Sequence, residues 1–141
     1  MMEIGGSMSP LYGTLFSKMA RRGKGQEIID ARLFGNMLAD AVQGVSEIGG
    51  AKVGDKTLMD VLIPADEAYR AVLAEGKDFS ECLEAMKFAS DAGWRSTKDL
   101  VAKIGRASRF GEYSRGVLDA GATSCNLIFR TMADAIQLLI R

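Results

Sequence analysis

The stretch ATSCNLIFRTMADAIQLLI, residues 122–140, decides the fold class because its apolar side chains recur every three or four positions. The recurring apolar positions are Cys125, Ile128, Phe129, Met132, Ile136 and Leu139. In an α-helix this spacing places all of them on one face. The stretch therefore predicts an amphipathic helix whose apolar face packs against other helices.

Two stretches near the N-terminus carry the same period. The first helix is predicted to begin at Ser9 and Pro10, because serine caps helix N-termini and proline suits the first turn. The second helix is predicted over about residues 26–48, and Gly49 and Gly50 end it. Both stretches therefore predict further amphipathic helices.

The middle of the chain predicts two more helices. One is expected to start near Lys56 or Thr57, and Pro64 within its pattern should kink it or mark a later start. The next opens at Asp78, with Glu81 three residues later as in a capping box. No stretch is convincing as a strand. The sequence thus predicts an all-α fold, a bundle of amphipathic helices.

Composition narrows the class of protein. The 141 residues suit one domain, and 18 Lys and Arg balance 18 Asp and Glu. A zero net charge gives no overall attraction to nucleic acid or to an anionic membrane. The chain has no His, which excludes Ser-His and Cys-His mechanisms within it. No apolar run reaches transmembrane length and no signal peptide is recognisable, so we expect a cytoplasmic location and no membrane partner.

Three glycine-bearing loops precede predicted helices, at residues 5–7, 49–57 and 119–124. Glycine lets backbone N–H groups approach an anion closely, and a helix N-terminus favours negative charge. A longer glycine-rich segment, residues 105–121, adds Arg106, whose guanidinium can bind a phosphate. Each loop taken alone is better explained by a turn and a helix cap. Taken together, the loops favour a phosphate or nucleotide site about as strongly as they favour plain turns between helices. The sequence has no Walker A or GxGxxG pattern.

Three segments resemble signatures of the nucleotide-binding L subunit of dihydroxyacetone kinases. Residues 49–60, GGAKVGDKTLMD, resemble that family's GGAKPGDKTMLD. The other two matches are residues 5–7 with 11–13, which resemble GGSSGxLYG, and residues 105–108, 111–112 and 119–124, which resemble GRAS-x-x-GERSIGH-x-DPGATS. All three occur in the family's order with similar spacing.

The resemblance implies a fold and an activity. In the family, eight antiparallel amphipathic helices form a barrel that holds a nucleotide among the loops at one mouth. In the bacterial phosphotransfer version the L subunit keeps ADP as a coenzyme. A phosphohistidine protein rephosphorylates that ADP, and the phosphoryl group passes to dihydroxyacetone on a separate K subunit. In ATP-dependent versions the same domain binds exchangeable ATP.

Carried over by position, the resemblance implies a nucleotide site. Its residues are Gly6, Ser7, Met8, Gly49, Thr57, Leu58, Arg106, Asp119 and Gly121. Lys56 is either a phosphate ligand or, the interpretation we favour here, a solvated lysine. Asp55 and Asp60 are interpreted as loop and helix caps instead of metal ligands. No catalytic residue is assigned.

One family motif is absent. The acidic GDGDHG-like motif, whose aspartates bind two magnesium ions in the family, has no counterpart before Gly5. We therefore expect residues 1–141 to form one L-subunit-like domain with six or so of the eight helices, without the first two. Such a bundle should expose apolar faces, so we expect a homo-oligomer or pairing with a missing segment.

Two functions follow from the resemblance. The first is a subunit that binds ADP or ATP and transfers a phosphoryl group to dihydroxyacetone or a similar small ketone. Its partners would be the K subunit and a phosphohistidine protein. The alternative is an inactive, truncated module that acts through partner binding or weak nucleotide binding.

Overall fold

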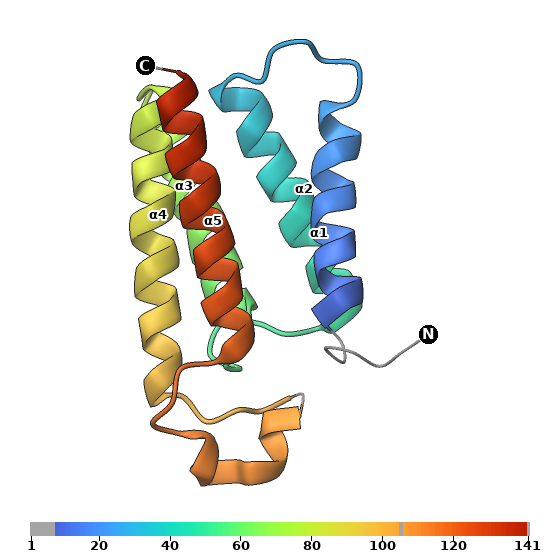
Figure 1. Cartoon of the computed structure of the whole chain (residues 1–141), viewed down its shortest axis with the longest axis vertical. Helices are drawn as coiled ribbons and strands as arrows, with labels where there is room; N and C mark the ends of the chain where they lie inside the picture. Colours follow the sequence, from blue (N-terminus) through green and yellow to red (C-terminus); the bar gives the residue numbers. More distant parts are fainter. Residues whose placement is uncertain (1–7, 105, 141) are drawn as a thin grey trace. The chain divides into compact units, whose positions relative to one another are not determined.

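The computed structural model describes residues 8–104 and 106–140, and these form helices and connecting loops without any strand (Figure 1). The α-helices are α1 Met8–Gly23, α2 Ala31–Gly49, α3 Met59–Ala74, α4 Phe79–Ser96 and α5 Ala120–Leu139. Two 3-10 helices follow α4, η1 Thr97–Asp99 and η2 Arg106–Ser114. The predicted all-α fold is confirmed. The chain divides into two compact units, residues 1–50 and 51–141.

Unit 1 contains the helical pair α1 and α2. Asp30 caps α2, because its backbone is extended and its carboxylate accepts the N–H of Leu33 at 2.8 Å. The predicted start of this helix at residue 26 is therefore wrong by five residues. At the other end Gly50 takes the left-handed conformation, with φ +68°, and donates its N–H to the carbonyl of Ser46.

Close packing joins α1 to α2 within unit 1. A Cβ added to Gly44 of α2 would lie 2.9 Å from the side chain of Lys18 and 3.1 Å from Thr14 on α1. Arg22 on α1 also donates two hydrogen bonds to the carboxylate of Asp40 on α2, at 2.7 and 2.9 Å. The α1 helix begins at Met8, slightly earlier than the predicted Ser9 cap.

Unit 2 contains α3, α4 and α5. Its fully buried apolar side chains come from all three helices and include Leu62, Tyr69, Leu83, Met86 and Phe129. The predicted capping box at the start of α4 is confirmed, since Asp78 accepts the N–H of Glu81 and Glu81 accepts the N–H of Asp78. Cys82 and Cys125 are buried free thiols, and burial raises the pKa of Cys125 to about 12.

The helices α3 and α4 meet most closely where proline interrupts the hydrogen bonding of α3. Pro64 lies inside α3, which begins at Met59 and so starts two or three residues later than the predicted Thr57 or Lys56. Proline has no N–H to donate to the carbonyl of Asp60, four residues earlier. Gly93 of α4 packs directly on that carbonyl, where an added Cβ would lie 2.0 Å from the oxygen. Only glycine fits this contact.

None of the helices in the described part of the chain is both long enough and apolar enough to cross a lipid bilayer.

Candidate functional site

Lys56 connects the loop before α3 to the segment that follows α4. Its Nζ donates hydrogen bonds to the carbonyl oxygens of Thr97, at 2.6 Å, and Val117, at 2.5 Å. Only 3% of its surface is exposed. The interpretation of Lys56 as a solvated lysine is therefore wrong, because tertiary contacts cover the ammonium and two backbone acceptors receive its protons.

The backbone at Lys56 has an unfavourable conformation. Its φ of +64° is the only positive value at a non-glycine position among the described residues. A side chain in this left-handed region costs about 1–2 kcal/mol. The nearby Gly54, with φ +100°, adopts a positive φ without that cost. The loop therefore places a lysine at a position that glycine would occupy more easily.

Two aspartates accept hydrogen bonds from the backbone N–H groups of the loop before α3. Asp60, which is 1% exposed, accepts the N–H groups of Gly54 at 2.7 Å and Thr57 at 2.9 Å. Asp55 accepts the N–H of Lys52 at 3.1 Å. Asp55 caps its loop as interpreted, whereas Asp60 is not the cap of α3: it accepts N–H groups of the preceding loop, and the N-cap position of α3, Leu58, has no side-chain hydrogen bond. These loop N–H groups are satisfied by the chain itself.

Asp119 caps α5 and faces Lys56. Its carboxylate accepts the N–H of Ala122 at 2.9 Å, and its own N–H donates to the hydroxyl of Thr97 at 3.0 Å. Burial raises the pKa of Asp119, while the capping hydrogen bond and the charge of Lys56 oppose that rise. Burial lowers the pKa of Lys56, and the charge of Asp119 opposes the change. The two groups thus stabilise each other's charged form at the start of α5.

The glycine-rich segment after α4 is ordered by hydrogen bonds to its neighbours. The N–H of Lys103 donates to the carbonyl of Asp55 at 3.2 Å, and the N–H of Gly116 donates to that of Lys98 at 2.7 Å. Residues 106–114 form η2, which is interrupted at Gly111 with φ +52°. We call residues 51–58 and 97–118, with the first turns of α3 and α5, the loop platform; it lies at one end of unit 2 (Figure 1).

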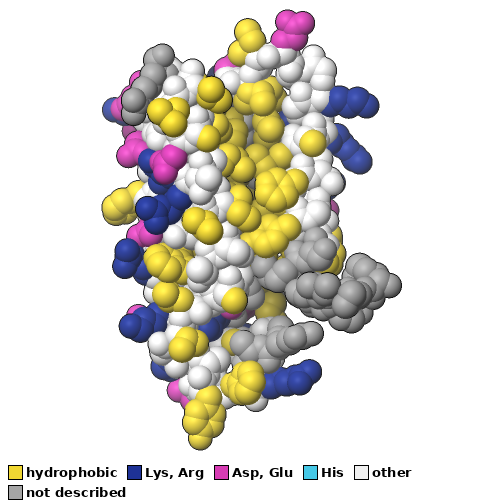
Figure 2. Space-filling model, viewed as in Figure 1, with side chains coloured by type: hydrophobic (Ala, Val, Ile, Leu, Met, Phe, Trp, Pro, Cys, Tyr) yellow, Lys and Arg dark blue, Asp and Glu magenta, His cyan; other side chains and the backbone are white. Residues whose placement is uncertain are grey.

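The loop platform is rich in cations although the whole chain has no net charge. Residues 51–58 and 97–118 contain seven Lys or Arg and three Asp or Glu. Even with Asp60 and Asp119 included, cations outnumber carboxylates. The exposed cations are Lys52, Lys98, Lys103, Arg109 and Arg115. Cationic and hydrophobic side chains reach the surface together at this end (Figure 2). Such a surface favours an anionic ligand that also has an apolar part.

Of the nine predicted site residues, four belong to the loop platform, one ends α2 in unit 1, and four lie wholly or in their side chains outside what the structure describes. Thr57, Leu58, Asp119 and Gly121 belong to the loop platform, with Thr57 partly exposed and Leu58 2% exposed. Gly49 ends α2 in unit 1. The remaining predicted residues fall outside what the structure describes, Gly6 and Ser7 entirely, and Met8 and Arg106 in their side chains.

Sequence reasoning missed Thr97 and misjudged Lys56. Thr97 contributes both its carbonyl and its hydroxyl to the loop platform. No motif includes Thr97, so no sequence signal was available for it. Lys56 stands within the quoted signature, but a lone lysine in a polar loop is usually solvated, and its burial depends on residues more than forty positions away.

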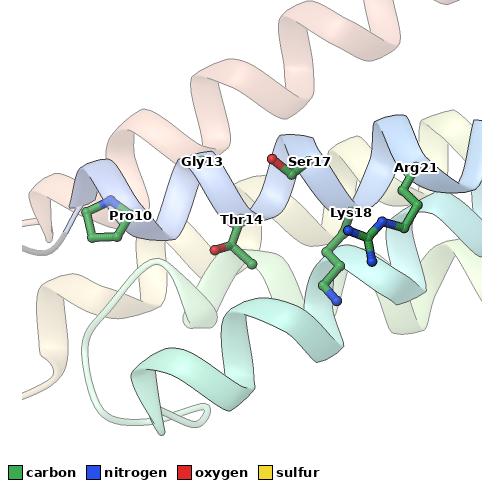
Figure 3. Close-up of a pocket in the computed structure, with 6 residues that line it drawn as sticks. All are labelled: Pro10, Gly13, Thr14, Ser17, Lys18 and Arg21. Carbon is green, nitrogen blue, oxygen red and sulfur yellow. The ribbon is translucent and has the colours of Figure 1, made fainter.

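A hollow of about 330 Å³ lies elsewhere, along α1 in unit 1 (Figure 3). It is lined by Pro10, Gly13, Thr14, Ser17, Lys18 and Arg21. These residues share one face of a single helix, and Thr14 and Lys18 lean toward α2. The hollow contains none of the predicted nucleotide-binding residues, and nothing else in its lining indicates a ligand.

The carboxylates of the loop platform do not fit a magnesium site. Asp55, Asp60 and Asp119 all accept backbone N–H groups. Across residues 8–104 and 106–140, no three acidic or cysteine side chains cluster closely enough to hold a metal ion.

Comparison with known proteins identifies the family. The family model of the DAK2 domain matches residues 1–134. The chain belongs to the DAK2 domain family. This confirms the resemblance to the L subunit that the three sequence segments indicated.

Characterised DAK2 relatives align along nearly the whole chain. The PEP-dependent dihydroxyacetone kinase, ADP-binding subunit DhaL, of Escherichia coli is 33% identical over 96% of this chain. The corresponding DhaL subunit of kinase 2 from Listeria innocua is 32% identical over 96%. The D-erythrulose kinase of Mycolicibacterium smegmatis is 34% identical over 96%. The chain spans 64%, 62% and 23% of the lengths of these three relatives, respectively.

Proposed function

We propose that this chain is the nucleotide-binding subunit of a kinase that phosphorylates dihydroxyacetone or a similar small ketone. ADP or ATP would bind at the loop platform. The observation that carries the proposal is the junction of two distant loops: Lys56 and Asp119 both bond to Thr97, so the loop that contains Thr57 and Leu58 is joined to the start of α5 in a region with excess positive charge. The proposal also includes Gly6, Ser7, Met8, Gly49 and Arg106 in the site.

The chemistry of the loop platform suits a nucleotide. The exposed cations attract the phosphates, and the guanidinium of Arg106 can form paired hydrogen bonds with one of them. Exposed apolar side chains, among them Val53 and Phe110, offer contacts for a base. Because Asp119 already caps the start of α5 and Asp60 accepts N–H groups of the loop before α3, cationic side chains and not bare backbone N–H groups would supply most of the affinity.

Two relatives support this function over the inactive alternative. Both DhaL subunits carry the description ADP-binding, and both belong to PEP-dependent kinases. In this proposal the acceptor ketone binds to a separate K subunit, and a phosphohistidine protein renews the nucleotide. No magnesium ligand is assigned to this chain.

Calorimetric titration with ADP and ATP, with and without magnesium, tests the proposal. We expect ADP to bind, and Arg106→Ala to weaken binding about tenfold, since a charged hydrogen bond to phosphate contributes roughly 1.5–3 kcal/mol. Arg130→Ala is the matched control, because Arg130 is an exposed arginine on α5 outside the platform. No binding at millimolar nucleotide would refute the proposed function, and unchanged affinity in Arg106→Ala would remove that residue from the site.

A further inference from the structure

We propose that Lys56 is a positioning residue for the nucleotide site, which fastens the two loops of the platform together without touching the nucleotide. The inference rests on the proposed function. It assigns Lys56 a task different from phosphate binding, since its ammonium points into the protein and donates to the carbonyls of Thr97 and Val117.

The connections around Lys56 support this task. Thr97 accepts from Lys56 through its carbonyl and from Asp119 through its hydroxyl, so one residue joins the loop before α3 to the start of α5. Lys103 adds a second connection, with its N–H on the carbonyl of Asp55 and its Nζ on that of Gly54. The two bonds from Lys56, at 2.6 and 2.5 Å, are shorter than those from Lys103, at 3.2 and 3.1 Å.

The backbone conformation at Lys56 indicates that the placement of this loop matters more than its stability. Lys56 is held at φ +64°, beside Gly54, although a glycine at this point would be unstrained. A strained conformation persists only where the surrounding structure fixes it, and such positions cluster at functional sites. Thr57 and Leu58 follow directly, so the conformation of Lys56 sets where these two proposed site residues lie.

Two measurements on the same variants test this role. The first is amide hydrogen exchange without nucleotide, read at Lys103, Gly116 and Asp119, whose N–H groups bond across the platform. The second is ADP affinity by calorimetry. The test variant is Lys56→Met, which keeps the aliphatic chain and removes the ammonium. The matched control is Ser90→Ala, which removes a buried hydrogen bond to Asn126 between α4 and α5, outside the platform.

We expect Lys56→Met to exchange faster at the three amides and to bind ADP about tenfold more weakly, since the buried carbonyl of Thr97 and the partly buried carbonyl of Val117 lose their donor. Ser90→Ala should change neither result at a temperature where both variants are folded. A general loss of stability would change amide exchange and ADP affinity in both variants, and not in Lys56→Met alone. If Lys56→Met does not fold, Lys56→Gln, which keeps one donor group, should show the same two changes at smaller size.

Three results would count against these ideas, and they are distinguishable. Unchanged exchange at the platform amides would overturn the positioning role of Lys56. Faster exchange with unchanged ADP affinity would also overturn it and would leave the proposed function intact. Absence of ADP binding by the unmodified chain would overturn the proposed function itself, whatever the exchange measurements show.

Discussion

The helical body of unit 2 and its loop platform are held together by different means. In the body, α4 and α5 are joined mainly by side chains, such as Ser90 to Asn126 and Lys87 to Asp134, each at 2.8 Å. In the platform, a side chain more often bonds a distant backbone group, as Lys56 does. Regular helices satisfy their own backbone and leave side chains to set register, whereas irregular loops need side chains to satisfy theirs. A single platform side chain therefore controls more of the local backbone than a single body side chain does.

The largest expected loss of stability comes from a substitution where α3 and α4 pack together. Gly93→Ala places a Cβ 2.0 Å from the carbonyl oxygen of Asp60, so α3 and α4 must separate. We expect a loss of about 3 kcal/mol or more in the free energy of unfolding, measured by urea denaturation. Gly13→Ala is the control, because its added Cβ meets no atom within 4 Å. That control should be stabilising by roughly 0.5–1 kcal/mol, and equal losses in both variants would refute the close contact.

The next loss of stability compares a carboxylate that holds the platform loop with a helix cap in the body. Asp60→Ala leaves the partly buried N–H groups of Gly54 and Thr57 without their acceptor, and we expect a loss of about 2 kcal/mol. Asp78→Ala removes the exposed cap of α4 and should cost only about 1 kcal/mol. Thermal unfolding of both variants measures the difference. If Asp78→Ala were the more harmful change, the platform would depend less on side chains than the structure indicates.

The smallest effect concerns a buried charge on α3. Asp66 is 3% exposed, its Oδ2 accepts a hydrogen bond from Arg70 at 2.8 Å, and its Oδ1 has no partner within the described residues. Burial raises the pKa of Asp66, and the bond from Arg70 opposes the rise. Above the ordinary pKa of 3.8 the unfolded carboxyl loses its proton first, so the free energy of unfolding falls as the pH rises through that window. Asp66→Asn should remove this fall and gain up to about 1 kcal/mol at neutral pH.

Asp40 provides the opposite sign for comparison. The hydrogen bond from Arg22 lowers the pKa of Asp40, so its contribution to stability is present above the ordinary pKa and is lost as the pH falls toward the lowered value. Asp40→Asn should therefore reduce stability at neutral pH and have little effect in strong acid. Thermal unfolding of both asparagine variants at about pH 3, 5 and 7 checks the two signs. If the effect of both substitutions on stability changed with pH in the same direction, the two opposite pKa shifts assigned to Asp66 and Asp40 would be contradicted.

The contrast between body and platform also explains what the sequence could predict. The apolar period located α4 and α5, and the Asp78 and Glu81 pair marked the start of α4, because these signals act over a few residues. The start of α2 was misplaced because residues 26–29, two polar and two apolar, contain no glycine or proline that would mark them as a loop. Lys56 was misjudged because its burial depends on Thr97 and Val117. Local signals contain no information about such distant partners.

Backbone-resolved NMR during an ADP titration tests the central claim most directly. If the loop platform binds the nucleotide, the amide signals of Thr57, Leu58, Asp119 and Gly121 should shift together and saturate at one affinity. The capping box of α4 at Asp78 should stay unchanged. Shifts confined to the hollow on α1, or no shifts at millimolar ADP, would contradict the account.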